Sequence, residues 1–376
     1  MRVALAADVH IANFKTMGGE LEGGINRRCR LVLDALRRAV TVAVQEGAGR
    51  FFILGDLFDT DTPSPAIIAA AIDALRHPDI QIEIIPGNHD VTSSAVGHSA
   101  LAPLRRAGIG VVDEAALVVV KTIAEFLFVP YEPGKVAEWF PRRVEQLAAV
   151  EAQAPRVLLA HAGLADAAMA PWLQTAGVSV DVVGDLIRKH GIQFCATGDF
   201  HQRREWYRND SGMWGRGNGG FGDGTLRWPR LLQVGALVPC DFGDQPPHGS
   251  ITILDLDKWT LKEIEIPGPR FITVTDREPL LIPKDGNTYF LRVQSDVKNR
   301  DASTAMIQDA KARGHVADGR VDVDRTEIKA QAATAAKNAS SAISTEGAID
   351  DYVRSMPIED GVDRDVVTQL VKGYLR

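Results

Sequence analysis

The sequence predicts a layered α/β fold: a four-layer β-sandwich in which two sheets pack together and helices cover their outer faces. Three observations support it. Short aliphatic or β-branched runs alternate with helical patterns from residue 1 to about residue 265. The continuous apolar character of these runs predicts strands that are buried on both faces, as expected for a sheet between another sheet and a layer of helices. Five of them also stop at polar side chains: residues 3–7, 51–54, 82–85, 157–160 and 194–196.

Helical patterns fill the segments between these strands. Residues 27–44 place leucine and alanine at helical spacing, with arginines on the opposite face. Residues 65–75 begin with Pro65, which suits the first turn of a helix, and residues 136–153 form a third predicted helix. Two further pairs of apolar runs are predicted as adjacent strands: 117–120 with 123–129, and 231–234 with 250–256.

The pattern changes beyond residue 268. A strand over 288–293, a helix over 303–313 and a strand over 319–324 predict a small β-α-β unit. Residues 327–345 are rich in Ala, Ser and Lys, which is typical of a linker or a solvated helix. Two short amphipathic helices follow at 348–356 and 362–375, and their apolar stripe either docks on a partner or packs locally. The predicted regions are therefore a catalytic domain at 1–268, a small α+β cap domain at 269–325, and a linker with a helical tail at 326–376.

Composition is that of an ordinary globular enzyme. The 376 residues are 45% apolar, and the net charge of −7 argues against a uniformly basic nucleic-acid binder while leaving local basic patches open. Three cysteines without a CxxC pair suit a reducing cytosol. No apolar stretch approaches the roughly 20 residues that span a bilayer, and the first strand already carries polar candidates. We therefore expect a cytoplasmic protein without a signal peptide or a membrane partner.

The polar clusters that end the five strands predict a metal centre. The carboxyl ends of strands in an open α/β sheet converge on one rim, so these clusters would meet there. Together the clusters contain carboxylates, an amide and several imidazoles. This number of ligands is too large for one ion and about right for two. Burying five such clusters without a cation would be costly. The clusters are Asp8-Val9-His10, 55–59, 87–90, 161–163 and 198–201.

The mixed donor set favours Mn²⁺, Fe or Zn²⁺ over Ca²⁺. We predict that Asp56 bridges two ions about 3.5–4 Å apart. His89 cannot easily share an ion with its neighbour Asn88, and is predicted as the general acid, held by Asp90 or Asp59. The remaining ligands divide between the ions as Asp8, His10 and His201 for one, and Asn88, His161 and Asp199 for the other.

The order DxH…GDxxD…GNHD…H…GxxH resembles that of the calcineurin-like metallophosphoesterases. Residues 55–64 (GDLFDTDTPS) and 235–244 (GALVPCDFGD) are more narrowly similar to SbcD-type DNA repair nucleases. The resemblance implies a catalytic role for His89, and Asp59 stands where some members carry a second catalytic histidine. The metal ligands that it implies are Asp8, His10, Asp56, Asn88, His161 and His201.

The same resemblance implies an exonuclease and endonuclease acting on DNA ends, with two divalent ions. Mn²⁺ is the first expectation, and Mg²⁺, Fe and Zn²⁺ are the alternatives. It also implies a homodimer that works with an SbcC-like coiled-coil ATPase. One position differs from the family pattern, because Asp199 stands where the family usually carries a histidine. An aspartate still binds a metal, and its charge should tighten a hard ion and slightly weaken Lewis acidity.

Candidate DNA contacts are less specific. Arg27 and Arg28 follow the first ligand loop, and either track phosphates or belong to a solvated helix face. Arg203, Arg204 and Trp206 combine cations with a stacking surface, as single-strand binders do, and their segment could equally be an insertion without a binding role.

Two rival functions remain open. One is a phosphoesterase for small phosphodiesters or phosphoproteins, which would share the motifs but would not need residues beyond 265. The other is a binding scaffold with a decayed, metal-poor site, of which Asp199 would be the first sign.

Overall fold

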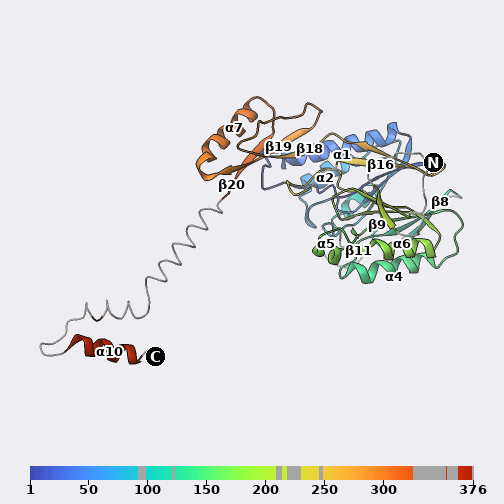
Figure 1. The fold of residues 1–376 in the computed structure, drawn as a ribbon. Helices are drawn as coiled ribbons and strands as arrows, with labels where there is room; N and C mark the ends of the chain where they lie inside the picture. Colours follow the sequence, from blue (N-terminus) through green and yellow to red (C-terminus); the bar gives the residue numbers. More distant parts are fainter. Residues whose placement is uncertain are drawn as a thin grey trace.

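The computed structural model describes residues 1–91, 99–120, 123–208, 214–217, 230–244, 249–324, 353 and 363–374. Within these residues, two large mixed sheets form the body of the molecule (Figure 1). One has the order β17-β16-β1-β4-β5-β6 and the other the order β14-β13-β15-β12-β9-β8-β7. The strands of the first sheet are β1 (Arg2–Ala6), β4 (Ala48–Leu54), β5 (Gln81–Ile85), β6 (Gly110–Val111), β16 (Ser250–Asp255) and β17 (Thr260–Glu265). Those of the second are β7 (Ala116–Val120), β8 (Ala124–Val129), β9 (Arg156–His161), β12 (Ile192–Gly198), β13 (Arg204–Arg208), β14 (Trp214–Gly217) and β15 (Arg230–Gln233).

The two sheets pack face to face. In β1, Val3 and Leu5 point into a core shared with the second sheet, whereas Ala4 and Ala6 point to the helices outside. Phe52 of β4 meets Phe126 of β8 across this core, with ring centroids 4.9 Å apart. Because successive side chains of a strand alternate between faces, strands buried on both faces read as continuous apolar runs. The predicted four-layer arrangement is confirmed.

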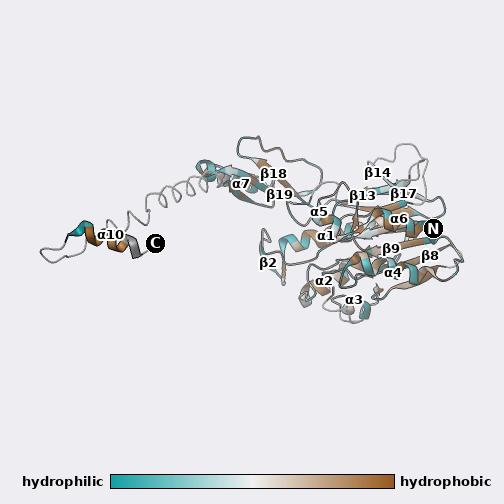
Figure 2. Ribbon diagram, turned by 60° about the horizontal axis from the view of Figure 1, so that its bottom comes forward, coloured by the Kyte–Doolittle hydropathy of each residue, from teal (hydrophilic) through white to brown (hydrophobic). Residues whose placement is uncertain are grey.

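Helices cover both outer faces. The first sheet carries α1 (Arg27–Gln45), α2 (Pro65–Leu75) and α3 (Ala102–Arg106), and the second carries α4 (Val136–Ala148) and α6 (Val180–Lys189). Figure 2 shows hydrophilic and hydrophobic colours on α4 and α6, as expected for helices with one face in the core. Asn26 caps the N-terminus of α1, and its side chain accepts the Cys29 N–H at 2.9 Å. Smaller elements are β2 (Leu21–Glu22), β3 (Ile25–Asn26), β10 (Leu164–Ala165), α5 (Pro171–Ala176) and β11 (Val178–Ser179).

One predicted strand pairing is confirmed and one is wrong. β7 and β8 pair antiparallel, as expected. β15 and β16 both form but lie in different sheets, because β15 pairs with β12 and β13 while β16 pairs with β1 and β17. Their chain order did not reveal that the backbone crosses from one sheet to the other between them.

The predicted β-α-β unit contains a third strand. β18 (Pro269–Thr275), β19 (Thr288–Asp296) and β20 (Asp318–Asp324) form a parallel sheet, with η1 (Val297–Asn299) and α7 (Arg300–Ala312) between the last two. Ile307 of α7 packs on this sheet in a separate small core. The unit touches the body at α1, where Arg27 Nη1 donates to the Ala317 carbonyl at 3.3 Å. The predicted boundary at 268 falls between β17 and β18, and the assignment of domains remains a prediction.

The tail is described only at residue 353 and over residues 363–374, which include α10 (Arg364–Tyr374). Val366 and Leu370 of α10 are 54% and 62% exposed. The predicted linker at 327–345 lies outside the described residues, and so does the predicted helix at 348–356 apart from Val353. None of the described helices combines the length and the apolar character needed to cross a bilayer.

Candidate metal centre

The loops that follow β1 and β4 are joined to each other by backbone hydrogen bonds. The Asp8 N–H donates to the Gly55 carbonyl at 3.1 Å, and the Val9 and His10 N–H groups both donate to the Asp56 carbonyl. Across the sandwich, the Asp199 N–H after β12 donates to both oxygens of Asp8, at 3.0 and 3.2 Å. Strand ends from both sheets therefore meet at one rim, as the sequence predicted.

His10 and His201 form one half of the centre. His10 Nδ1 lies 3.0 Å from an Asp59 oxygen, and His201 Nδ1 lies 3.0 Å from an Asp244 oxygen. A carboxylate accepts hydrogen bonds, so each Nδ1 carries the ring proton and each Nε2 presents a lone pair when the ring is neutral. The two Nε2 atoms face each other at 3.1 Å. When both rings are neutral, the two opposed lone pairs repel each other, and either a proton on one ring or a metal ion between them removes the repulsion.

His161 forms the other half in the same way. Its Nδ1 lies 2.8 Å from the Leu54 carbonyl oxygen, which fixes the proton there. Its Nε2 faces three oxygen atoms: Asn88 Oδ1 at 3.0 Å, Asp56 Oδ2 at 3.5 Å and Asp199 Oδ1 at 3.8 Å. One nitrogen and three oxygens, all acceptors, thus surround one position. This is a donor set that a divalent cation fits.

Asp56 lies between the two halves. Its Oδ2 is 3.8 Å from His10 Nε2 and 3.5 Å from His161 Nε2, and its Oδ1 accepts the His89 N–H at 2.9 Å. Asp56 also belongs, with Asp8 and His10, to a group whose ligand atoms all lie within 4.8 Å of one another. This position is the one that a bridging carboxylate needs.

The electrostatic field at the centre favours positive charge. Burial lowers the pKa of His161, but Asp56, Asp199 and Asp8 outweigh it and raise that pKa to about 9. Burial also opposes a charge on His201, yet hydrogen bonds to Asp244 and Cys240 and the charge of Asp8 raise its pKa to about 12. Burial raises the pKa of Asp8 itself. Acids and imidazoles crowded in this way are suited to hold cations.

The backbone is strained at four of the predicted ligands. The φ angles are 51° at Asp8, 50° at His10, 50° at Asp56 and 89° at Asp199. Side chains other than glycine seldom occupy this region, and such outliers cluster at functional sites. Gly55 must also lack a side chain, because a Cβ there would lie 2.0 Å from His161 Nδ1. The loops are therefore shaped to aim ligands at this rim.

His89 lies at the open side of the centre. Its side chain is 42% exposed, and its Nδ1 is 3.2 Å from the Asp59 carbonyl oxygen and 3.8 Å from Asp59 Oδ1. Burial raises the pKa of Asp59, but a hydrogen bond with His10 and the charges of His10, His89 and Arg28 bring it below its ordinary value. Asp59 thus touches both a predicted ligand and the predicted general acid.

Asp90 was considered as a partner that holds His89, but in the structure it links two backbone loops. Its carboxylate accepts the N–H groups of Leu57, Phe58 and Gly87 at 3.2, 3.0 and 3.0 Å, which ties the loop after β5 to the loop after β4. Of the two partners proposed for His89, the structure shows contact with Asp59.

Two residues at the centre were not among the predicted site residues. Asp244 holds His201 and also accepts the Cys240 N–H at 2.6 Å. The Cys240 sulfur lies within 4.8 Å of ring nitrogens of His10 and His201, and burial raises the pKa of this thiol to about 11. Both lie in the segment 235–244, which was noted only for its resemblance, and no strand-end motif marked them.

Arg28 does not lie on a DNA-binding surface in this structure. It is 5% exposed, donates to the carbonyls of Thr16 and Cys240, and stacks over Phe14 at 3.8 Å and Phe271 of β18 at 4.8 Å. Its guanidinium joins α1 to the cap and to the Cys240 segment. Arg27, by contrast, is exposed and reaches the cap carbonyl described above.

The segment at 203–206 also differs from the predicted binding loop. Trp206 is 1% exposed and its Nε1 donates to Asp166 at 2.9 Å, so no ring face is open for stacking. Arg203 is 5% exposed and bonded to Thr252 and Glu205. Arg204 contacts Gln202 and is half-buried. The arginines and the tryptophan lie in or beside β13, which pairs with β14 and β15, and this pairing accounts for their burial.

Comparison with known proteins identifies the family. The calcineurin-like phosphoesterase family matches residues 1–203, more than half of the chain. A protein of Thermus thermophilus is similar in structure at 15% identity and a TM-score of 0.41, covering 70% of this chain and 98% of its own. A dimetal phosphatase from Danio rerio is similar at 15% identity and a TM-score of 0.43, covering 67% and 91%. A purple acid phosphatase from yellow lupin seeds is similar at 14% identity and a TM-score of 0.36, covering 55% and 39%. The chain belongs to the calcineurin-like phosphoesterase family of hydrolases.

Proposed function

We propose that this metallophosphoesterase is a DNA nuclease, the nuclease subunit of an SbcCD-like double-strand-break repair complex that hydrolyses phosphodiesters with two divalent ions. The observation that carries the hydrolytic part is the pair of positions where an imidazole Nε2 faces only atoms that can ligate a metal ion. Asp8, His10 and His201 would hold one ion, Asn88, His161 and Asp199 the other, and Asp56 would bridge them. Mn²⁺ is the ion proposed first, with Mg²⁺, Fe and Zn²⁺ as alternatives.

When bound, two such ions supply an activated water and neutralise charge on the phosphate. The protein's own side chains do the rest. The Asp59 carbonyl fixes His89 through Nδ1, which leaves Nε2 directed away from that contact and free to give a proton to the leaving oxygen. With 42% of its side chain exposed, His89 can reach a substrate that lies over the rim.

Support for DNA as the substrate comes from the segments 55–64 and 235–244 and from the α+β unit beside α1. The 235–244 segment takes part in the centre through Cys240 and Asp244. The proposed partners are DNA, a second copy of the chain and an SbcC-like coiled-coil ATPase, in the cytoplasm of a bacterial cell or a virus-infected host. The exposed apolar residues of α10 are a candidate docking face for the ATPase.

A second candidate is a phosphoesterase acting on small phosphodiesters or phosphoproteins. The burial of Arg28, Arg203 and Trp206 favours it, because three of the five predicted DNA contacts are not free to meet a duplex. A metal-poor scaffold is the third, and the intact lone-pair geometry around His161 argues against it.

End-labelled linear duplex DNA and closed plasmid, tested beside bis-p-nitrophenyl phosphate under a titration of Mn²⁺ and Mg²⁺, separates these candidates. The nuclease proposal expects cleavage of DNA at low enzyme concentration, increased by the cognate ATPase. Turnover of the small diester without any DNA cleavage would favour the second candidate. Loss of both activities with fewer than two ions per chain would favour the scaffold.

A further inference from the structure

The two metal positions differ in the chemistry of their ligands. The position facing His161 is surrounded by the oxygens of Asn88, Asp56 and Asp199. Carboxylate and amide oxygens are hard ligands that suit Mn²⁺ and Mg²⁺. The aspartate at 199, where the family usually has histidine, adds another hard oxygen ligand and so increases the preference of this position for hard ions. The position between His10 and His201 has two imidazoles, the carboxylates of Asp8 and Asp56, and a nearby thiol that the His161 position lacks.

We propose that Cys240 is a ligand of the ion between His10 and His201, and that it makes this position selective for a soft divalent ion of the Zn²⁺ type. The inference rests on the two-metal centre of the proposed function. The centre would then hold an unlike pair, with the harder ion at His161.

Geometry is the first support. The Cys240 sulfur and ring nitrogens of His10 and His201 all lie within 4.8 Å of one another. The tautomers of both histidines are fixed by Asp59 and Asp244, so two Nε2 lone pairs already point to one position. A thiolate completes a set of three soft or borderline ligands of the kind found in zinc sites.

The second support is that the backbone holds Cys240 in place on both sides. Its N–H donates to Asp244, the same carboxylate that fixes His201, and its carbonyl accepts from the buried Arg28 guanidinium. The sulfur lies within 4.8 Å of a His201 ring nitrogen. A residue bonded in this way is held beside its partner before any ion arrives, which lowers the cost of ordering it on binding. When the sulfur binds the ion, the thiol proton leaves to solvent.

The other two cysteines provide a control. Cys29 lies inside α1 and Cys195 inside β12, both in hydrophobic cores and both fully buried. Neither belongs to a group of metal-capable side chains found among the described residues. A sulfur signal from bound metal therefore has one candidate source.

The test is cobalt spectroscopy on the full chain after its metals have been removed with a chelator. Titration with Co²⁺ should give two bound ions per chain and a near-ultraviolet thiolate-to-cobalt charge-transfer band. The band should vanish in Cys240→Ser and persist in Cys195→Ala. Zn²⁺ should displace the cobalt that gives the band, whereas Mg²⁺ should leave the band in place.

The outcomes separate this inference from the proposed function. Two cobalt ions bound by the wild-type protein without a charge-transfer band would overturn the Cys240 assignment and leave the metal centre standing. A band that survives in Cys240→Ser would also overturn it. Failure of the wild-type chain to bind cobalt at all would remove the metal centre and this inference with it. The wild-type spectrum decides even where the Ser variant does not fold.

Discussion

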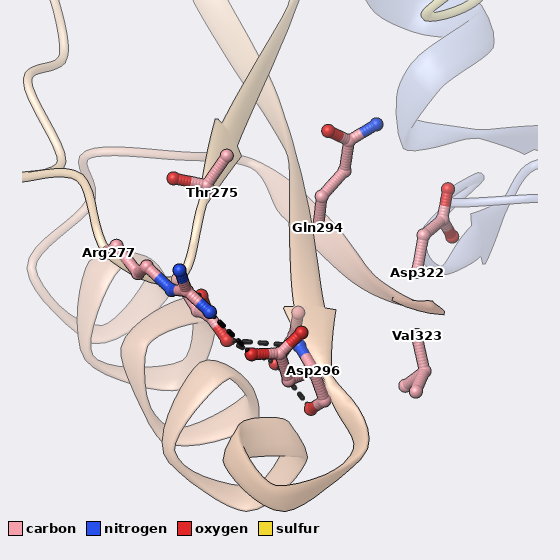
Figure 3. A pocket seen from close by; sticks show the side chains of 8 residues that line it. Thr275, Arg277, Gln294, Asp296, Asp322 and Val323 are labelled. Atoms are coloured by element: carbon pink, nitrogen blue, oxygen red, sulfur yellow. Dashed lines mark hydrogen bonds and ion pairs between the residues drawn. The ribbon is translucent and has the colours of Figure 1, made fainter. Parts of the chain in front are cut away.

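Parallel strands end in acidic residues in two regions of this molecule, the rim of the sandwich and the cap. In the cap, Asp276, Asp296 and Asp322 lie around a pocket of about 440 Å³ at the carboxyl ends of β18, β19 and β20 (Figure 3). Asp276 accepts hydrogen bonds from Ser295, Asn299 and the Asp296 N–H, and Arg277 pairs with Asp296 at 2.8 Å. Asp322 pairs with Arg320 at 3.1 Å, so each of these acids has a partner among its own neighbours.

At the rim of the sandwich the carboxylates also accept backbone N–H groups, but they converge on imidazoles rather than on arginine, serine or asparagine. His10, His161 and His201 each have one ring nitrogen fixed by an acceptor, and the other nitrogen aimed at further acceptors. The backbone there adopts strained φ angles, and none of the residues with positive φ other than glycine lies in the described part of the cap. Acids at strand ends alone therefore do not mark a metal centre. A metal centre is marked instead by imidazoles whose Nδ1 is held by an acceptor and whose Nε2 faces further acceptors that several residues share.

The largest effect is expected from Asp56→Ala. Removing the carboxylate between the two halves should leave neither position with a complete donor set, so both ions and all measurable phosphoesterase activity should be lost. Calorimetry with Mn²⁺ and elemental analysis would measure this. Asp322→Ala at the cap should retain both ions. Two ions still bound by Asp56→Ala would remove the bridging assignment.

His89→Ala should lower kcat by about 10²- to 10⁴-fold, the usual contribution of a general acid, while the metal content stays at the wild-type value. Steady-state kinetics beside elemental analysis separates the two effects. His77→Ala, a change at a histidine remote from the rim and beside Asp79, is the control. Activity near that of the wild type would contradict the role given to His89.

Asp244→Ala should weaken metal binding by about 10- to 100-fold, because the carboxylate fixes the His201 ring and its tautomer. Competition with a metal-binding dye would measure the affinity. Asp296→Ala provides the matched change at a strand end of the cap and should have no effect. Equal metal affinities of Asp244→Ala and Asp296→Ala would contradict the claim that the rim binds metal and the cap does not.

Arg28→Ala should lower the free energy of unfolding by about 1–3 kcal/mol, since buried carbonyls of Thr16 and Cys240 lose their donor. Arg37→Ala, an exposed arginine paired with Asp34 on the same helix, should change it by no more than about 0.5 kcal/mol. Denaturant unfolding would measure both. Unchanged stability together with weaker, less salt-dependent DNA binding would return Arg28 to a phosphate-contacting role.

The sequence predicted the parts of the site that follow strands. Asp8, Asp56, Asn88, His161 and Asp199 each lie within three residues of the end of an apolar run, so their convergence follows from the sheet topology. Asp244 and Cys240 were not predicted as site residues because they lie in an irregular segment after β15, where no periodicity of apolar residues indicates which way a side chain points. The burial of Arg28 also could not be predicted, because it depends on Phe271, more than two hundred residues away in the cap.

A crystal of the full chain, first freed of metal with a chelator, then soaked in excess Mn²⁺ and measured at the manganese absorption edge, tests the central claim most directly. The account predicts two anomalous peaks about 3.5–4 Å apart at the rim, one beside His10 and His201 and one beside His161 and Asn88, with Asp56 between them. A rim without peaks, or manganese bound instead among the acids of the cap, would contradict it.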